Sequence, residues 1–391
     1  MKRRVGSFMS DGGVYITGTG AYLPNAPVEN DAMERILGQV GAKPSRARRT
    51  VLRSNGIVQR HYAIDPESLR FNDTNAGMTA KAVRSLESGG SPLPRVGCLA
   101  CGTSIADQLM PGHAVMVHGE LGWPACEVVS TAGVCVAGMT AMKYAIMAVA
   151  SRHHRAAVAT GSELSSASMR AEAFSPEIDA RVESLEHHPE LAFEKDFLRW
   201  MLSDGAGAVL LEREPRPGGV SLRVDWLDIV SYAGEMETCM YAGAVKRSDG
   251  GLDGWRSFNA DTCFRDSVMS VKQDVKLLHD GVVRYTVEKP IKEVLGRREL
   301  SADAIDFFLP HFSSQFFRDR LTAGLRAAGL DIPQDRWFTT MSTCGNTGAA
   351  AIYVMLDALF RSGRIEPGHR LLCFVPESGR FSSAYLHLTA V

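Results

Sequence analysis

Short apolar runs and longer amphipathic segments alternate along the chain, and this alternation predicts an α/β fold. The β-rich run at residues 14–24 ends at glycines and a proline, so we expect a strand followed by a turn. Apolar runs at 95–103, 127–130, 155–160 and 307–310 predict further strands. Sheets buried on both faces have continuous apolar runs of this kind.

Apolar residues at helical spacing predict helices between these strands. One helix is expected at 30–40, with its apolar face made by Met33, Ile36, Leu37 and Val40. Further helices are expected at 72–86, 111–120 and 135–150. Residues 42–62 are basic and irregular, so the sequence predicts a solvated loop there.

The pattern divides the chain into two halves. A Gly/Ala turn and strand at 204–213 precede a Pro/Gly-rich segment, which separates an N-terminal half, 1–215, from a C-terminal half, 216–391. A charged segment of helical character at about 169–200 is expected to form a cap inserted into the first half.

One short motif occurs in both halves. Ser130-Thr-Ala-Gly precedes a helix of small and apolar residues, and so does Ser342-Thr-Cys-Gly. A duplicated α/β unit would place two such turns opposite each other, although a pattern this short also arises by chance.

Composition limits the classes of function. The 391 residues correspond to two or three domains, or to one large duplicated unit. Forty-three Lys and Arg balance 44 Asp and Glu, which argues against a protein whose main partner is nucleic acid.

The sequence also predicts a cytoplasmic protein without membrane insertion. The longest uncharged stretch, 337–356, begins with Thr, Ser, Asn and Gly, so we expect a polar turn followed by a buried helix. No apolar segment follows the basic residues at 1–4, as a secretory leader would require. Several of the eight cysteines lie in apolar runs, which is typical of reduced, buried thiols.

Cys135 is the best candidate for a nucleophile. It follows a turn of small residues and opens a predicted helix, whose free N–H groups and partial positive charge would stabilise a thiolate. The alternative is an inert core cysteine, and position alone does not separate the two.

His311 and Asn346 are also candidates for site residues, although the sequence patterns around them are less specific than that around Cys135. His311 follows an apolar strand, and the ends of strands in α/β sheets are where binding sites gather. Asn346 lies in a glycine turn before a helix, where it could equally be an N-cap.

The sequence predicts neither a metal site nor a cofactor. Cys98 and Cys101 have metal-ligand spacing but lie inside a predicted strand without a second ligand pair. His153 and His154 are expected to face solvent. The Gly18-Thr-Gly20 turn lacks the third glycine of a dinucleotide fingerprint.

Taken together, these residues resemble a known family. The chain is similar to the ketoacyl-acyl-carrier-protein synthase III-like condensing enzymes of the thiolase superfamily. Seven ordered features carry the resemblance: the opening strand at 16–24, Asn55-Gly-Ile57 with Arg60-His61, Cys135, Asp204-Gly-Ala-Gly-Ala208, His311, Gly345-Asn346-Thr347, and the closing segment 364–379.

The resemblance implies a duplicated five-layer α-β-α-β-α fold, a homodimer and a Cys135–His311–Asn346 catalytic site. Cys135 would accept an acyl group from a thioester, and the backbone N–H groups of Cys135 and Gly379 would form the oxyanion hole. His311 and Asn346 would polarise the second thioester for a Claisen-type condensation. Acyl carrier protein, coenzyme A thioesters or both are the implied partners.

Departures from the family pattern indicate a specialised ketosynthase. The usual His-Gln-Ala-Asn is His311-Phe-Ser-Ser314, and the usual glycine triplet is Glu377-Ser378-Gly379. Thr50 and Ser54 occupy positions where the family has a tryptophan and an arginine for coenzyme A. The segments 311–314 and 374–382 resemble the dialkylresorcinol or cyclohexanedione-forming branch, which joins two β-ketoacyl-type thioesters.

Two other functions stay open, and three arginines are candidates for binding the carrier protein. The alternatives are an acyltransferase with an oxygen or nitrogen acceptor, and a housekeeping synthase that initiates fatty acids. Arg53, Arg318 and Arg320 could bind an acidic carrier protein, or could be ordinary solvated residues.

Overall fold

The computed structural model describes residues 13–40, 48–89, 93–173 and 198–391. Most of the cap expected at about 169–200 lies outside the described residues. No helix within these ranges has the length and apolar character needed to cross a membrane.

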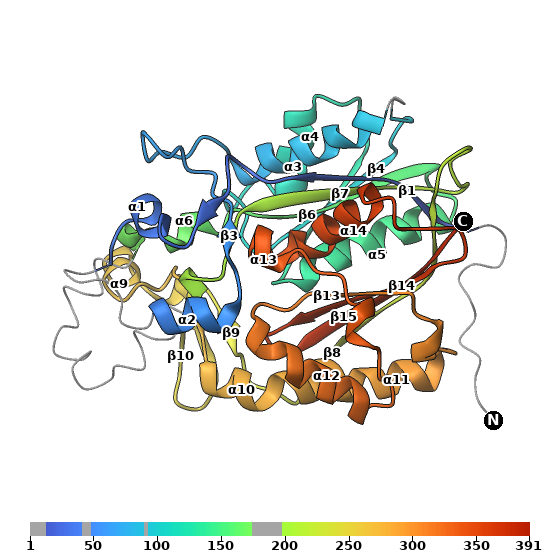
Figure 1. Cartoon of the computed structure of the whole chain (residues 1–391). Coiled ribbons are helices and arrows are strands. Elements are labelled where there is room, and N and C mark those ends of the chain that lie inside the picture. The colour runs from blue at the N-terminus through green and yellow to red at the C-terminus, as the bar shows by residue number, and fades with distance from the viewer. Residues whose placement is uncertain (1–12, 41–47, 90–92, 174–197) are drawn as a thin grey trace.

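One nine-stranded mixed sheet runs through the molecule and folds around two central helices (Figure 1). The N-terminal half contributes β5 (Glu127–Ala132), β4 (Cys98–Thr103), β6 (Ala156–Glu163), β7 (Gly205–Glu212) and β1 (Tyr15–Tyr22), in that spatial order. The C-terminal half continues it with β8 (Leu222–Ser231), β15 (Ser382–Ala390), β14 (Arg370–Glu377) and β13 (Phe307–Pro310).

Helices complete a five-layer α-β-α-β-α arrangement (Figure 1). The two central helices are α5 (Val136–Ala150) and α14 (Ala351–Arg361), and apolar side chains from both halves pack around them. Two helices cover the outer face of the first half, α3 (Asn75–Arg84) and α4 (His113–Leu121). Three cover the second, α10 (Val275–Val283), α11 (Lys289–Arg297) and α12 (Arg318–Ala327). The expected fold class is therefore confirmed.

The strand order is the same in both halves. The first half is ordered β5-β4-β6-β7-β1 and the second β13-β14-β15-β8, with a single parallel bridge between Phe308 and Trp337 in the place equivalent to β5. The innermost strands, β1 and β8, pair antiparallel through Tyr15–Arg223 and Ile16–Leu222. The two Ser-Thr-x-Gly motifs differ in structure, because residues 130–132 lie within β5 whereas residues 342–344 lie in the short helix α13 (Met341–Cys344). The boundary between 215 and 216 stays a prediction and falls in the loop between β7 and β8.

The turn just before α14 approaches α5 and β6 at glycines. A Cβ on Gly138 would lie 2.4 Å from the carbonyl oxygen of Ala349, and one on Gly161 would lie 2.1 Å from the same atom. The Tyr353 hydroxyl donates to the Gly138 carbonyl at 2.7 Å. Backbone from the two halves therefore meets in the centre of the molecule, which only residues without a side chain permit.

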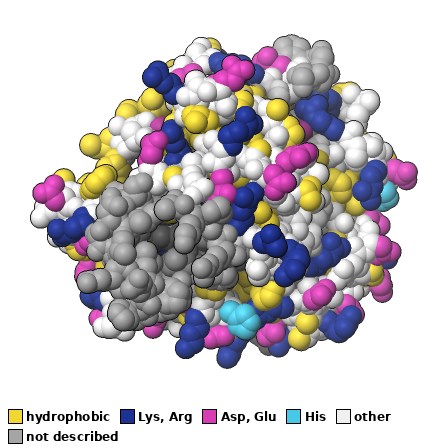
Figure 2. Space-filling model, turned by 60° about the vertical axis from the view of Figure 1, so that its left-hand side comes forward, with side chains coloured by type: hydrophobic (Ala, Val, Ile, Leu, Met, Phe, Trp, Pro, Cys, Tyr) yellow, Lys and Arg dark blue, Asp and Glu magenta, His cyan; other side chains and the backbone are white. Residues whose placement is uncertain are grey.

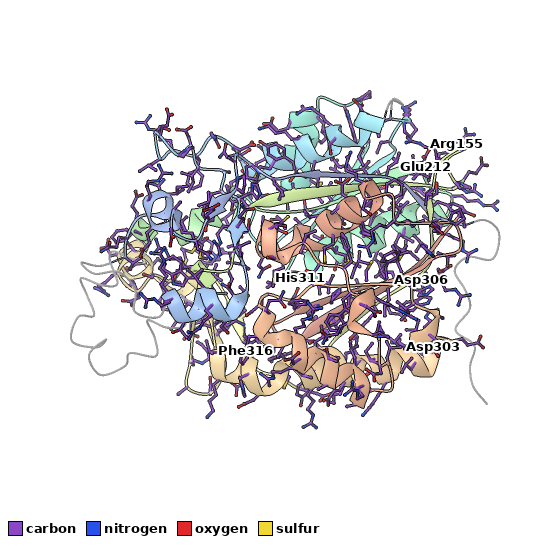
Figure 3. The ribbon with its side chains drawn as sticks, in the orientation of Figure 1. Arg155, Glu212, Asp303, Asp306, His311 and Phe316 are labelled. Atoms are coloured by element: carbon purple, nitrogen blue, oxygen red, sulfur yellow. The ribbon has the colours of Figure 1, made fainter. Side chains whose placement is uncertain are left out.

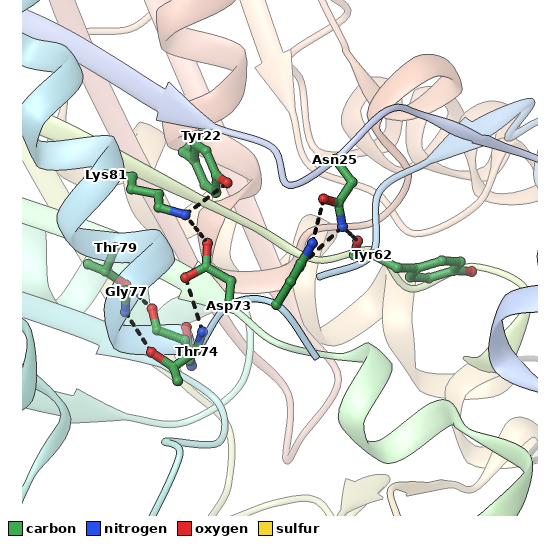
Figure 4. Close-up of polar contacts among 10 residues, drawn as sticks. Tyr22, Asn25, Tyr62, Asp73, Thr74, Gly77, Thr79 and Lys81 are labelled. Carbon is green, nitrogen blue, oxygen red and sulfur yellow. Dashed lines mark hydrogen bonds and ion pairs between the residues drawn. The ribbon is translucent and has the colours of Figure 1, made fainter. Parts of the chain in front are cut away.

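Helix α3 shows how local capping sets an element's start. The Thr74 hydroxyl accepts a hydrogen bond from the Gly77 N–H at 2.9 Å (Figure 4), which satisfies a free donor of the first turn. Lys81 then pairs with Asp73 at 2.6 Å and reaches the Tyr22 hydroxyl. The helix expected at 72–86 is confirmed, although its α-helical part is shorter because Thr74 caps it and Ser85 begins a 3₁₀ turn.

The prediction of a solvated loop at 42–62 is wrong for the described part. Helix α2 (Arg48–Asn55) packs through Val51 and Asn55, and the Asn55 amide donates to the Trp200 carbonyl at 3.0 Å. Arg60 is fully buried and donates to the Asn30 side chain at 2.7 Å. Tertiary packing of a few inward residues stabilises the helix despite its basic composition.

Two other elements differ in extent. Helix α1 covers only Met33–Leu37, because the chain turns at Gly38 with a φ of 79°, and Val40 lies beyond it. The expected Gly/Ala turn at 204–208 is instead the start of β7. A Cβ on Gly207 would lie 2.3 Å from the Tyr353 Cβ, so the small residues serve close packing on α14.

We expect Gly161→Ala to destabilise the protein by about 1–3 kcal/mol, because the new methyl group overlaps a backbone carbonyl that cannot move freely. The measurement is urea-induced unfolding followed by circular dichroism. Gly119→Ala is the matched control, since its Cβ meets nothing within 4 Å and alanine favours the helix by up to about 1 kcal/mol. Equal effects of the two changes would contradict the central close approach.

Candidate active site

A cavity of about 550 Å³ lies between the two halves and brings the predicted site residues together. Cys135, His311, Asn346 and Gly379 all line it. Figure 3 shows His311 in the interior of the molecule, away from the end that carries Arg155 and Glu212. The first half contributes Cys135 to this cavity, and the second half contributes the other three.

Cys135 is the N-cap residue of α5. The preceding strand, β5, ends at Ala132, so the turn of small residues places the thiol at the carboxyl edge of the sheet. The sequence therefore located this residue correctly within its element, and its catalytic role stays a prediction.

His311 follows β13 directly and is 5% exposed. Its backbone N–H donates to the Phe374 carbonyl at 2.8 Å, which continues the β13–β14 pairing by one residue. Burial lowers the pKa of the His311 imidazole to about 4. The ring is therefore neutral at physiological pH and acts as a hydrogen-bond donor or acceptor rather than as a cation.

Asn346 is held by both its backbone and its side chain. Its N–H donates to the Met201 carbonyl at 3.0 Å, and its carbonyl accepts from Ser203 at 2.9 Å. The side-chain oxygen accepts from the Gly348 N–H at 3.0 Å, whereas the N-cap residue of the 3₁₀ turn that follows is Thr347, so the N-cap alternative is wrong for Asn346. The amide nitrogen makes no hydrogen bond within the described ranges, and it stays available as a donor.

Two carboxylates in the cavity were missed by the sequence analysis. Glu377 ends β14, and one of its oxygens accepts from the N–H groups of Val134 and Val136 at 3.0 Å each. Glu163 ends β6, and one of its oxygens accepts from Ser104 and from the Ala349 N–H at 3.1 Å. The only indication in the sequence that Glu377 is unusual is that an acidic residue stands where the family resemblance implies a glycine.

The thiolate expected at Cys135 is wrong for the resting site. Desolvation by the surrounding protein, followed by the charges of Glu377 and Glu163, raises the pKa of the Cys135 thiol well above its usual range. Glu377 takes the helix N–H groups that would otherwise favour a thiolate. Burial also raises the pKa of Glu377, and it raises that of Glu163 to about 7.

Cys135 and Gly379, whose N–H groups are the predicted oxyanion hole, both line the cavity. The Gly379 carbonyl accepts from the N–H groups of Cys239 and Met240, at 2.9 and 3.2 Å, which fixes the turn after β14. No hydrogen bond among the described residues joins the N–H of Cys135 or Gly379 to another residue. Both donors are thus free for a substrate oxygen, and their role stays a prediction.

The three candidate docking arginines differ in their surroundings. Arg53 is exposed on α2. Arg318 donates to the Gln334 side chain at 3.0 Å, and Arg320 donates to the His279 carbonyl at 2.6 Å. Helix α2 packs against residues 315–317, just before α12, so the three arginines belong to neighbouring elements. Basic and acidic side chains are interspersed over the face drawn in Figure 2.

A second polar cluster lies outside the cavity. His154 is half-buried and pairs with Glu127 at 2.6 Å, which corrects the expectation that it faces solvent, whereas His153 is exposed. These three residues have ligand atoms within 4.8 Å of one another and offer a set that could hold a metal ion. They lie at the opposite end of β5 from Cys135, so they belong to no step of the chemistry in the cavity.

Comparison with known proteins gives two sequence-family matches. Residues 58–216 match the family described as beta-ketoacyl synthase, N-terminal domain. Residues 295–383 match 3-oxoacyl-[acyl-carrier-protein] synthase III, C terminal. The first segment contains Cys135, and the second contains His311 and Asn346.

Solved structures share the fold over almost the whole chain. A tetronic acid condensing enzyme, AbyA1, has 19% identity and a TM-score of 0.71, with 96% of this chain and 99% of that chain covered. The 3-oxoacyl-[acyl-carrier-protein] synthase III from Aquifex aeolicus has 19% identity and a TM-score of 0.69, with 96% and 100% covered. A cysteine-to-serine variant of OleA from Xanthomonas campestris, solved with lauric acid and lauroyl-CoA, has 18% identity and a TM-score of 0.68, with 96% and 99% covered.

The order of the matched segments agrees with the order of the two structural halves, and the five-layer fold agrees with the solved structures. The chain therefore has the fold of the solved synthase III structures, its first half matches the beta-ketoacyl synthase N-terminal domain, and its second half matches the synthase III C-terminal domain.

Proposed function

We propose that this protein is a ketosynthase that forms a carbon–carbon bond by Claisen-type condensation. An acyl or β-ketoacyl thioester loads Cys135, and a second β-ketoacyl or malonyl thioester supplies the attacking carbon. The observation that carries the proposal is that Cys135, His311 and Asn346, from opposite halves of the chain, line one cavity.

Each residue has a distinct role in this reaction. The Cys135 sulfur attacks the first thioester and keeps its acyl group, which separates loading from condensation. The neutral His311 ring and the Asn346 amide donate hydrogen bonds to the second thioester's carbonyl oxygen and stabilise the enolate. A neutral imidazole suits this role because it donates without adding a fixed charge.

The walls of the cavity favour fatty acyl chains. Most are apolar side chains from several elements: Met201, Leu202, Val282, Val287, Leu321 and Phe374. Such a lining binds alkyl chains by excluding water. The likeness to OleA and AbyA1 adds support for a role in fatty-acid-derived secondary metabolism, and we propose the dialkylresorcinol or cyclohexanedione type.

We further propose a homodimer joined at the edge of the sheet. Strand β5 ends the strand order and is only partly buried, so its outer edge is open to pairing. Nearby, Leu109 and Met110 are 71% and 85% exposed. A second copy pairing along β5 would cover these apolar side chains. A cytoplasmic location stays a prediction.

Incubation with an acyl thioester is expected to add one acyl mass to the wild-type protein and none to Cys135→Ala, measured by intact mass spectrometry. His311→Ala and Asn346→Ala should still load, because Cys135 is intact. Condensation by these two variants should fall by about 10²–10³-fold, since each removes one donor to the enolate oxygen.

The masses and fragmentation patterns of the products, measured by mass spectrometry, distinguish the proposed condensation from the two alternative reactions. A new carbon–carbon bond supports the proposed condensation. An ester or amide product would instead make the protein an acyltransferase. Activity restricted to short primers and malonyl thioesters would indicate the housekeeping reaction.

Arg53→Glu is expected to weaken binding of acyl carrier protein by roughly tenfold at low salt, with a smaller difference at 0.5 M NaCl, because the contact is electrostatic and exposed. Biolayer interferometry at several salt concentrations measures this. Arg95→Glu is the matched control, since Arg95 is exposed before β4, about 20 Å from the cavity end of that strand. Equal weakening by both variants would contradict docking at α2.

A further inference from the structure

Glu377 stands beside the reactive cysteine in a position that the condensation described so far does not use. It ends β14, lines the cavity, and replaces a residue for which the family resemblance implies glycine. We propose that Glu377 is the general base that takes the proton from the Cys135 thiol when the acyl group is loaded. This inference rests on the proposed function and specifies how its first step proceeds.

Two hydrogen bonds hold the Glu377 carboxylate close to Cys135. One oxygen of Glu377 accepts from the N–H groups of Val134 and Val136, the residues on either side of Cys135. These two bonds fix the carboxylate at the start of α5. They also leave its other oxygen without a partner among the described residues, and a Cβ on Gly379 would lie 3.3 Å from that oxygen. The free oxygen therefore faces the predicted oxyanion turn.

The N-terminal end of α5 alone does not ionise the Cys135 thiol. The N–H groups of Val134 and Val136, on either side of Cys135, already bind Glu377, and the carboxylate charge opposes a second negative charge beside it. Cys135 is therefore a neutral thiol at rest. A neutral thiol is a poor nucleophile, so loading needs a proton acceptor.

Other groups in the cavity suit this role less well. The titratable and charged side chains that line it with Glu377 are Cys135, Glu163, Tyr241, His311 and Arg380. His311 is a weak base because burial lowers its pKa to about 4. Glu163 accepts hydrogen bonds from Ser104 and Ala349 rather than from the residues flanking Cys135. Its charge acts on the pKa of the Cys135 thiol less strongly than the charge of Glu377 does. Arg380 is exposed and donates to the Met236 carbonyl.

The loading step balances with these residues alone. The thiol proton moves from the Cys135 sulfur to the free oxygen of Glu377 while the sulfur forms a bond to the thioester carbonyl carbon. The bond from that carbon to the departing sulfur then breaks. Protonated Glu377 returns the proton to the departing thiolate, so a free carrier or coenzyme A thiol leaves and Glu377 is again a carboxylate.

The test compares two reactions of Cys135 in Glu377→Gln. Glutamine keeps an oxygen that can accept the two helix N–H bonds but cannot take a proton. Acyl loading at pH 7, followed by quenched intact mass spectrometry, should slow by about 10²-fold or more. Alkylation by iodoacetamide should be unchanged or faster, because it depends on the thiolate fraction and the variant removes a negative charge beside the thiol.

The pH dependence provides a second readout. In the wild type, loading should rise with pH as Glu377 loses its proton, at a pH above the ordinary range for glutamate because burial raises its pKa. The increase of the loading rate with pH should be absent in Glu377→Gln and partly restored in Glu377→Asp. Glu163→Gln, the matched control, removes a carboxylate from the same cavity and should keep the rise.

The possible results separate the inference from the proposed function. No acyl adduct on wild-type Cys135 would remove the proposed function and this inference with it. Normal wild-type loading with a Glu377→Gln rate within threefold of it would overturn the inference alone. Loading and alkylation slowed by the same factor, with a lowered melting temperature, would assign Glu377 a structural role only and would also overturn it.

Discussion

The structure depends on the close approach of two backbone segments in its central layer. The glycines of β6 and α5 allow the Ala349 carbonyl to lie where side chains would otherwise be, and Tyr353 bonds across the same contact. Cys135 lies one turn before Gly138, and Asn346 lies three residues before Ala349. The contact that joins the halves thus also sets the spacing of the groups that we propose carry out the reaction.

The same burial determines the chemistry of the cavity. Desolvation of the individual groups keeps the imidazole neutral and the thiol protonated, and the carboxylates hold their protons more tightly than in solution. The reaction that we propose would therefore use proton transfers and neutral hydrogen-bond donors rather than preformed ions. A carbanion-forming reaction benefits from this arrangement because developing charge meets donors already in place.

The sequence predicted what local pattern controls. The apolar runs located β4, β6 and β13, and the small-residue turn located the start of α5, because strand burial and helix capping depend on nearby residues. Features that depend on distant residues were missed. Glu377 contacts Val134 across 243 positions, so no local pattern could show that it takes the helix N–H groups. Helix α2 was missed for the same reason, because its inward residues pack on Trp200.

The duplicated halves are unequal at their outer margins, and this limits how copies could associate. On one margin β5 is an open strand, whereas on the other the Phe308–Trp337 bridge already occupies the place beside β13. If two molecules join along their open strands about a twofold axis, the joined sheet has no open strand left at either margin. Growth would then stop at a pair, and in such a dimer the asymmetry between the two margins would keep a large continuous sheet from polymerising into fibres.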